Sequence, residues 1–349
     1  MAFYIYHTEQ FFQNIIRDSS ANIQASLEEK EGSYEKFSIS KNSGTRTIYS
    51  IKSESKLKKY QKNLLSNFFE YINISDQSYG FVKERSYKDY LQPHINNNLY
   101  KDRYYLRLDI KEFFESIKRE TIKEELSFYF RLKDSKQTEE ILKLVTDIVT
   151  LNDSIPQGAV TSPTLSNIIF RELDVKINAY CNQLGVVYTR YADDMLFSSF
   201  REHDKFAQPL IKVIYKILKT KGFKLNYKKT IKGKNQISLN GFIVGDNIRL
   251  SRKRKKDINN IIFHYYKSGK NIEQFLNSLS EVDLIYRHKN INSLGSLVNY
   301  LNGYRAFLID WIPVNVSNDK ISKHSKNIDT IEQIVERLEN FKNSIRKLK

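Results

Sequence analysis

Two adjacent carboxylates, Asp193 and Asp194, interrupt a segment that otherwise has the pattern of a β-hairpin, TRYADDMLFSS (residues 189–199). Large side chains such as Tyr191 and Met195 pack well in a pleated sheet, and the two acids occupy the turn between them. Alone, they could be ordinary turn residues, since Asp is frequent in turns. Two like charges among apolar residues are hard to desolvate, however, so we expect a neutralising partner.

A third carboxylate, Asp109, ends an apolar stretch, LRLDIKEFF. Taken alone, it could cap a helix over KEFFESI. Three carboxylates at one sheet edge would instead repel one another unless cations neutralise them, and Mg²⁺ takes one or two carboxylates plus substrate phosphates. Two such metals, ~3.5–4 Å apart, activate an attacking hydroxyl and stabilise the leaving oxygen of a phosphoryl transfer.

The elements that would position these acids begin with residues 103–110, RYYLRLDI, which alternate and are rich in aromatics, as in a strand. Residues 161–185 then have the apolar spacing of a helix. Ser162 is its expected N-cap, Pro163 fits the first helical position and Gly185 fits the C-terminal cap.

The hairpin follows, then a second helix that ends at Gly222 and a strand at FKLNY. The order strand, helix, hairpin, helix, strand is that of a ferredoxin-like β-α-β-β-α-β sheet, with a helical insertion after the first strand. In this topology the first strand lies beside the hairpin. We therefore expect Asp109 to neighbour Asp193 and Asp194, far away in the sequence.

The composition narrows the class of protein. A chain of 349 residues can bury a large core, and a net charge of +17 suits a polyanionic partner, although it could also be a solubilising surface charge. A single cysteine, Cys181, excludes an internal disulfide framework and a Cys-rich zinc site. No apolar stretch reaches the ~18–20 residues that span a bilayer, so we expect a cytoplasmic protein without membrane contact.

The pattern divides the chain into three parts. Residues 1–44 resemble a helical N-terminal extension that ends in a polar stretch, residues 45–247 contain the predicted sheet, and residues 248–349 are mostly helical. An apolar face from Ile328 to Ile345 predicts a last helix, for packing or for a partner.

YADD in a hairpin resembles the catalytic motif of reverse transcriptases. Further blocks are similar to the family's in order and spacing over roughly residues 45–250: TRTIYSIKSESKLKKYQ (45–61), YGFVKERS (79–86), YLRLDIKEFFESI (105–117), SIPQGAVTSPTLSNIIF (154–170) and GFKLNYKKT (222–230). The resemblance implies an α+β right-hand polymerase, with fingers and a ferredoxin-like palm in residues 45–247. Residues 248–349 would be a helical thumb and a C-terminal helix.

The resemblance also implies roles for the acids. Asp109, Asp193 and Asp194 would be the ligands of two Mg²⁺ ions, for which Mn²⁺ could substitute, and the carbonyl of Ile110 would be a fourth oxygen.

Other matched positions would contact the incoming nucleotide. Phe114 would be the steric gate against a 2′-OH, although it could also be a core residue beside Phe113. Gln157 and Gly158 would line the nucleotide pocket, although PQG is also an ordinary turn sequence.

Basic residues match the family's phosphate-binding positions. Arg46 and Lys58 would hold the triphosphate, and either Lys228 or Lys229 would be the proton donor to pyrophosphate. The basic run that opens the thumb would contact the template–primer backbone without reading its sequence, or would be a solvated charge run: Arg252, Lys253, Arg254, Lys255 and Lys256.

The sequences IPQGAVTSP and YADDMLFSS are most similar to the corresponding segments of bacterial retron-type enzymes. The chain departs from two retron marks: YLQPH, ending at His94, replaces Asn-Ala-x-x-His, and LNG, ending at Gly241, replaces Val-Thr-Gly. These departures point toward related reverse transcriptases of anti-phage defence.

The resemblance implies that the protein binds a non-coding RNA as template or primer and copies it into a DNA product from dNTPs, in anti-phage defence. A toxin or effector protein would be a further partner, and an oligomer is compatible with the sequence. Template-independent synthesis primed by a protein tyrosine, as in abortive-infection enzymes, is one alternative. A catalytically idle RNA-binding scaffold is the other.

Overall fold

The structure is a computed structural model that describes residues 3–41, 44–98, 100–280, 294–309, 328–340 and 343. The chain divides into two compact units, Met1–Leu239 with Ile243–Arg249 and Asn240–Phe242 with Leu250–Lys349. None of the helices within the described ranges is long and apolar enough to cross a bilayer.

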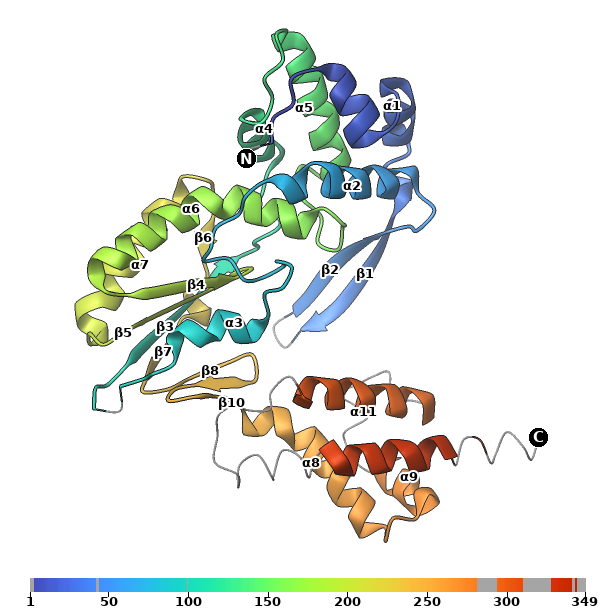
Figure 1. Ribbon diagram of the computed structural model, residues 1–349, viewed down its shortest axis with the longest axis vertical. Helices are drawn as coiled ribbons and strands as arrows, with labels where there is room; N and C mark the ends of the chain where they lie inside the picture. The colour runs from blue at the N-terminus through green and yellow to red at the C-terminus, as the bar shows by residue number, and fades with distance from the viewer. Residues whose placement is uncertain are drawn as a thin grey trace. The chain divides into compact units, whose positions relative to one another are not determined.

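The first unit is built around an antiparallel sheet (Figure 1). Its strands are β3 (Tyr104–Lys111), β4 (Val187–Tyr191), β5 (Asp194–Ser199), β6 (Lys224–Leu225) and β7 (Ile231–Lys234). The order is β4-β5-β3-β6, and β7 pairs with the beginning of β3 beside β6. The first of these strands thus lies between the third and the fourth, which confirms the predicted ferredoxin-like topology.

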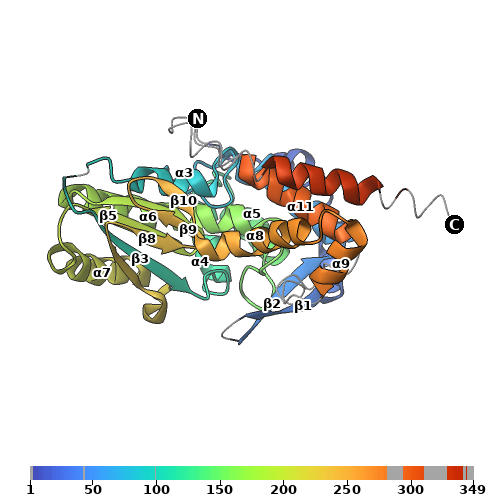
Figure 2. The same ribbon diagram turned by 90° about the horizontal axis from the view of Figure 1, so that it is seen from below.

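Two long helices, α6 (Ser162–Leu184) and α7 (His203–Lys219), pack against each other and against the sheet (Figure 2). Apolar side chains of the central strands join the same buried cluster as these helices: Leu106, Leu108, Met195 and Phe197. Because successive strand residues point to opposite faces, Arg107, Asp109 and Asp194 lie on the other face.

The ends of α6 test two predictions about caps. Gly185 ends the helix in the left-handed conformation, with φ 62°, as predicted. The predicted N-cap was wrong, because Thr161 is the N-cap and Ser162 is the first helical residue. The loop before the helix folds back, and the hydroxyl of Ser162 therefore donates to the carbonyl of Pro156 at 2.7 Å.

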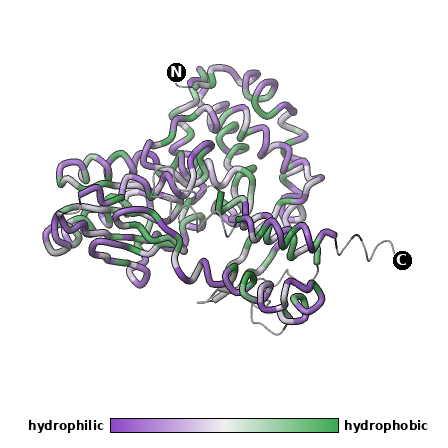
Figure 3. The backbone as a smooth tube through the Cα atoms, turned by 60° about the horizontal axis from the view of Figure 1, so that its bottom comes forward, coloured by the Kyte–Doolittle hydropathy of each residue, from purple (hydrophilic) through white to green (hydrophobic). Residues whose placement is uncertain are grey.

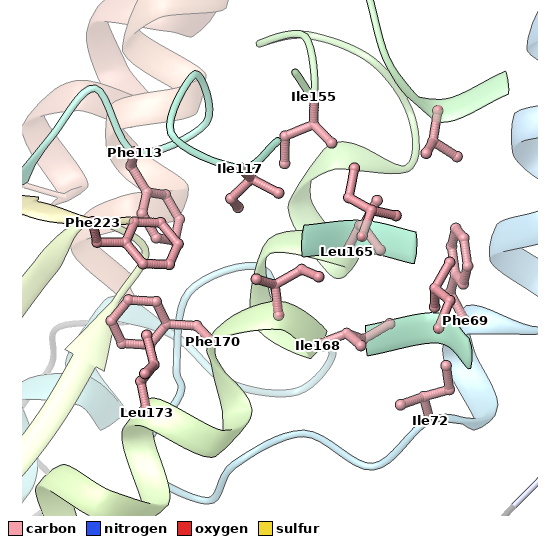
Figure 4. Close-up of a cluster of buried hydrophobic side chains, with 14 of the residues drawn as sticks. Phe69, Ile72, Phe113, Ile117, Ile155, Leu165, Ile168, Phe170, Leu173 and Phe223 are labelled. Atoms are coloured by element: carbon pink, nitrogen blue, oxygen red, sulfur yellow. The ribbon is translucent and has the colours of Figure 1, made fainter. Parts of the chain in front are cut away.

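The predicted helical insertion after β3 consists of α4 (Arg119–Ser127) and α5 (Ser135–Val149). The turn that leads into it carries Phe113, which meets Phe170 of α6 and Phe223 before β6 (Figure 4). The three ring centroids lie 5.2–5.8 Å apart. These rings join the elements that surround the end of β3.

The N-terminal region contains more structure than the predicted helical extension. A π-helix, η1 (Gln10–Ile16), and α1 (Ser20–Glu28) are followed by a hairpin of β1 (Tyr34–Lys41) and β2 (Gly44–Ile51). Residues 34–41 are therefore a strand rather than part of a helical extension, because Phe37 and Ile39 alternate with polar residues and the segment pairs with β2. The remaining short elements before β3 are η2 (Glu31–Ser33), α2 (Lys56–Asn67), η3 (Phe69–Tyr71), α3 (Tyr87–Leu91) and η4 (Gln92–His94).

The chain passes into the second unit through a three-stranded sheet of β8 (Ile237–Leu239), β9 (Phe242–Val244) and β10 (Ile248–Leu250). The helices that follow are α8 (Arg252–Lys267), α9 (Ile272–Ser280), α11 (Leu294–Ile309) and residues 328–340. Hydrophobic and hydrophilic stretches alternate along these helices (Figure 3).

The helix at residues 328–340 packs within the second unit. Its Thr330 hydroxyl lies 3.2 Å from that of Tyr266, and its Arg337 donates to the carbonyl of Lys270 at 3.1 Å. This favours the packing alternative for the last helix, although Ile345 lies outside the described residues.

Candidate active site

The antiparallel pairing of β3 with β5 places Asp109 directly opposite Asp194. The amide of Ile110 donates to the carbonyl of Asp193 at 3.0 Å, which fixes the turn against the end of β3. The expected proximity of the three acids is therefore confirmed. Asp109 belongs to a strand, so it does not cap a helix over KEFFESI.

A buried arginine, Arg190, stabilises the turn that carries Asp193. Arg190 is 0% exposed and donates to both carboxylate oxygens of Asp174 on α6, at 2.8–3.2 Å. It also donates to the carbonyl of Ala192 at 3.0 Å, and Ala192 has the strained φ of 56°. Arg190 thus fixes the residue that precedes the acids.

Residues 77–80, which include the start of the YGFVKERS block, pack on the same turn. Tyr79 and Gln77 exchange backbone hydrogen bonds with Arg190 at 2.8 and 2.7 Å. Gly80 approaches so closely that a Cβ there would lie 2.6 Å from the amide nitrogen of Ala192. A side chain at position 80 would displace the turn, which explains the glycine.

Among the described residues, two cations contact Asp109 and Asp194. Arg107 donates through Nε to Asp194 at 2.9 Å, and its guanidinium is 3.6 Å from Asp109. The Nζ of Lys229 lies 3.0 Å from Oδ1 of Asp109, although both Lys229 and Lys228 are exposed. The geometry therefore favours Lys229 over Lys228 as the lysine of this site.

Sequence analysis missed Arg107. The signal was present, because Arg107 lies two residues before Asp109 in a predicted strand, and side chains two apart share one face.

The acids remain under electrostatic strain. Burial raises the pKa of Asp193, and the neighbouring charges of Asp194 and Asp109 raise it further. In the described part of the chain, no group donates a hydrogen bond to the buried Oδ2 of Asp109.

The carboxylates of Asp109, Asp193 and Asp194 are ligands of the kind that Mg²⁺ prefers. The Oδ2 atom of Asp109, which accepts no hydrogen bond from the described residues, is available to such an ion. A preassembled cage is not formed, because no three acidic, His or Cys side chains converge as metal ligands within the described ranges.

The predicted nucleotide-contacting residues lie in two places. Phe114 follows β3 and is half-buried, with its ring centroid 5.5 Å from that of Phe113 and 6.1 Å from that of Phe81. The backbone carbonyl of Gln157 accepts a hydrogen bond from the amide of Tyr49 in β2 at 2.8 Å. This contact joins the predicted pocket block, residues 154–170, to the β1–β2 hairpin.

Gly158 makes this approach possible. Its φ is +112°, and a Cβ would lie 2.8 Å from the carbonyl oxygen of Tyr49. Arg46 is on β2 as well, but its side chain lies outside the described part. Lys58 donates to the carbonyl of Ile51 and the hydroxyl of Ser53, both at 3.3 Å, so it is held by the loop before its own helix.

The basic run opens α8 in the second unit. Arg252 and Lys256 are exposed, and Lys255 is half-buried. The side chains of Lys253 and Arg254 lie outside the described residues.

The histidine of YLQPH anchors α3 and η4 to the sheet. His94 is 0% exposed, and its ring nitrogens lie 2.7 Å from the hydroxyl of Ser198 and 2.8 Å from that of Thr189. Burial lowers the pKa of His94 well below its ordinary value, and the nearby Arg103 lowers it further. In the same segment, the ring of Tyr90 lies 5.8 Å from that of Tyr191, the residue opposite Asp194, and sequence analysis did not single out Tyr90.

The chain is similar to known proteins in sequence and in structure. The family described as reverse transcriptase (RNA-dependent DNA polymerase) matches residues 36–244. The Retron Ec73 reverse transcriptase of Escherichia coli is 36% identical over 198 residues, which cover 54% of this chain and 60% of that protein. The Retron Ec86 reverse transcriptase of Escherichia coli is 31% identical over 237 residues, which cover 65% and 67%. Apo telomerase from Candida tropicalis matches in structure with a TM-score of 0.48 and 13% identity, over 87% of this chain and 62% of that chain.

Proposed function

The chain belongs to the reverse transcriptase family, with retron reverse transcriptases as relatives and a right-hand polymerase fold, and on that premise we propose that it is an RNA-directed DNA polymerase. The match covers about 60% of the length of the Ec73 relative. The observation that carries the proposal is the pairing of Asp109 with Asp194 at the end of the central strand, with Asp193 in the adjoining turn.

In this function Asp109, Asp193 and Asp194 hold two Mg²⁺ ions, with the carbonyl of Ile110 as a further oxygen. When bound, such ions activate the attacking 3′-hydroxyl and stabilise the leaving oxygen of the nucleotide. The open, buried Oδ2 of Asp109 supports this role. Lys229 donates a proton to pyrophosphate in this proposal, which its ion pair with Asp109 supports.

The substrate is a dNTP paired with an RNA template. Phe114 excludes ribonucleotides by contact with a 2′-OH, and its neighbour Phe81 supports the ring. The β1–β2 hairpin, which carries Arg46, contacts the predicted nucleotide-pocket block through the backbone carbonyl of Gln157. The basic run of α8 binds the nucleic-acid backbone, and a net charge of +17 favours such a partner.

We further propose that the template is an associated non-coding RNA and that synthesis serves anti-phage defence, together with an effector protein. A plaque assay in cells that carry the wild-type chain or the Asp193→Asn, Asp194→Asn variant tests the defence role. Protection that persists in the variant would instead identify an RNA-binding scaffold.

The activity is tested with the purified protein–RNA complex, labelled dNTPs and Mg²⁺. We expect labelled DNA from the wild type and none from the Asp193→Asn, Asp194→Asn variant. Asp153→Asn is the matched control, because Asp153 is exposed and its φ of 64° is tolerated by Asn. Label that resists RNase pretreatment and migrates with the protein until proteolysis would favour protein-primed, template-independent synthesis.

A further inference from the structure

Arg107 occupies the space where the two paired acids meet. Its guanidinium bonds Asp194 through Nε at 2.9 Å and through a second, closer N–H contact, and it lies 3.6 Å from Oδ1 of Asp109. The arginine side chain is only 14% exposed, so solvent does little to screen its charge. The position of Arg107 is fixed from both sides, because β3 pairs with β5 and with β7 at this residue.

A guanidinium in this place competes with a divalent cation in two ways. Its N–H groups both bond Oδ1 of Asp194, one of the two oxygens that this carboxylate would offer to a metal. Its positive charge also repels a second cation, and this repulsion is strong where water is excluded. A metal that binds Oδ1 of Asp194 therefore displaces the guanidinium from this oxygen.

A buried hydroxyl is available to receive it. Tyr90 is 0% exposed, and among the described residues no group forms a hydrogen bond with its OH. The ring of Tyr90 lies 5.8 Å from that of Tyr191, which is paired with Asp194 in the hairpin and therefore shares its face of the sheet. An unsatisfied buried hydroxyl is costly, so an arginine N–H directed to it would be favourable.

We propose that Arg107 is a resident counter-ion of the active site, which holds Asp194 in the metal-free protein and turns to the hydroxyl of Tyr90 when a divalent cation binds. The arginine then has opposite effects in the two states. It stabilises the metal-free fold by neutralising paired acids, and it weakens metal binding by competition. A purely positioning role would predict that its removal weakens metal binding.

The first test measures Mn²⁺ binding to the full chain by electron paramagnetic resonance, with the signal of the Asp109→Asn, Asp193→Asn, Asp194→Asn variant subtracted. Arg107→Gln keeps a donor for Asp194 but removes the charge, and we expect at least about tenfold tighter binding. Arg107→Lys, which keeps the charge, should stay within about threefold of the wild type. Unchanged or weaker binding in Arg107→Gln would overturn the proposal.

Lys232→Gln is the matched control for charge. Lys232 lies on β7 opposite Leu106, so it belongs to the other face of the same sheet and is exposed. This variant loses the same charge, and we expect its Mn²⁺ affinity to equal that of the wild type. An equal gain in Lys232→Gln and Arg107→Gln would show a general charge effect and would contradict the specific role of Arg107.

Thermal unfolding in EDTA gives an independent measurement. Arg107→Gln should melt about 5 °C below the wild type, because its acids repel without a counter-ion. Saturating Mn²⁺ should raise the melting temperature of this variant by more than it raises that of the wild type. An equal rise in both proteins would contradict competition.

Tyr90→Phe tests where the guanidinium goes. The hydroxyl has no role in the metal-free state of the proposal, so the variant should melt in EDTA at or above the wild-type temperature. Its Mn²⁺ affinity should fall by about threefold or more, because the displaced arginine loses its acceptor. Unchanged affinity would overturn the transfer to Tyr90.

The inference rests on the proposed metal site but is separable from polymerase activity. If wild type and triple Asp variant bind Mn²⁺ equally, the metal site itself is wrong. If the triple Asp variant loses Mn²⁺ binding but Arg107→Gln and Tyr90→Phe bind Mn²⁺ as tightly as the wild type, the metal site is correct and the counter-ion role is wrong.

Discussion

Replacement of Arg190 by Met should be among the most destabilising substitutions in the first unit. Arg190 and Asp174 are both 0% exposed, and the arginine makes hydrogen bonds to Asp174, Ala192, Ser78 and Asn167. Its guanidinium also lies 4.4 Å from the ring centroid of Phe170 on α6.

Removal of one partner of a buried ion pair typically costs about 3–5 kcal/mol, because the other charge is left uncompensated. The hydroxyl of Tyr188 donates to Asp174 at 2.6 Å, and among the described residues it would be the donor that remains in Arg190→Met. A domain is stable by about 5–15 kcal/mol, so the loss would be a large share of the total.

Urea unfolding followed by circular dichroism measures this cost. The double variant Arg190→Met, Asp174→Leu removes both charges, and we expect it to recover more than half of the lost stability. Its DNA synthesis should nevertheless remain below that of the wild type, because the hydrogen bond that holds the Ala192 carbonyl is still missing. A cost below about 1 kcal/mol in Arg190→Met would refute the reasoning.

Three further substitutions test other parts of the site. Phe114→Ala should admit ribonucleotides in a primer-extension assay, and unchanged sugar discrimination would remove the gate assignment. Gly80→Ala should lower the free energy of unfolding by about 1–3 kcal/mol, since its Cβ would meet the backbone of Ala192, and equal urea midpoints would contradict this contact. Burial lowers the pKa of Lys30 to about 8, partly offset by Asp147, so the unfolded chain binds more protons between pH 8 and 10.5 and wild-type stability should rise across this range. Lys30→Met should lack this rise in urea unfolding at pH 7 and 10, and parallel pH curves for both proteins would show that Lys30 titrates normally.

The sequence contained enough information to predict the position of the acids. Alternation in residues 103–110, the helical spacing before Gly185 and the hairpin together specified a ferredoxin-like order, and this order brings Asp109 to Asp194. Local periodicity was sufficient because the topology leaves few ways to arrange these elements.

The cations around the acids could not be predicted in the same way. Both lysines lie in the short helix η5 (Tyr227–Lys229) after β6 and both are exposed, so their position relative to Asp109 depends on the geometry of this turn. Tyr90 reaches the site because His94 binds hydroxyls on β4 and β5, a contact between distant segments that no local pattern reveals.

Strand β1 was missed for a different reason. Its alternating residues include polar and charged ones on both faces, and Phe37 and Ile39 are each 49% exposed. A two-stranded hairpin buries little apolar area, so its hydrophobic signal is weak. The N-cap was misplaced by one residue, because the helix already begins at Ser162 and Thr161 precedes it as the N-cap.

The central claim is that a carboxylate on β3 and two in a distant turn form one site for DNA synthesis. Incorporation of a single labelled dNTP by the protein–RNA complex of Asp109→Asn tests this claim most directly, because that change leaves the YADD turn intact. The account predicts a loss on the order of 10³-fold or more, as large as that of Asp194→Asn. Incorporation by Asp109→Asn within a few-fold of the wild type, with Asp194→Asn inactive, would contradict it.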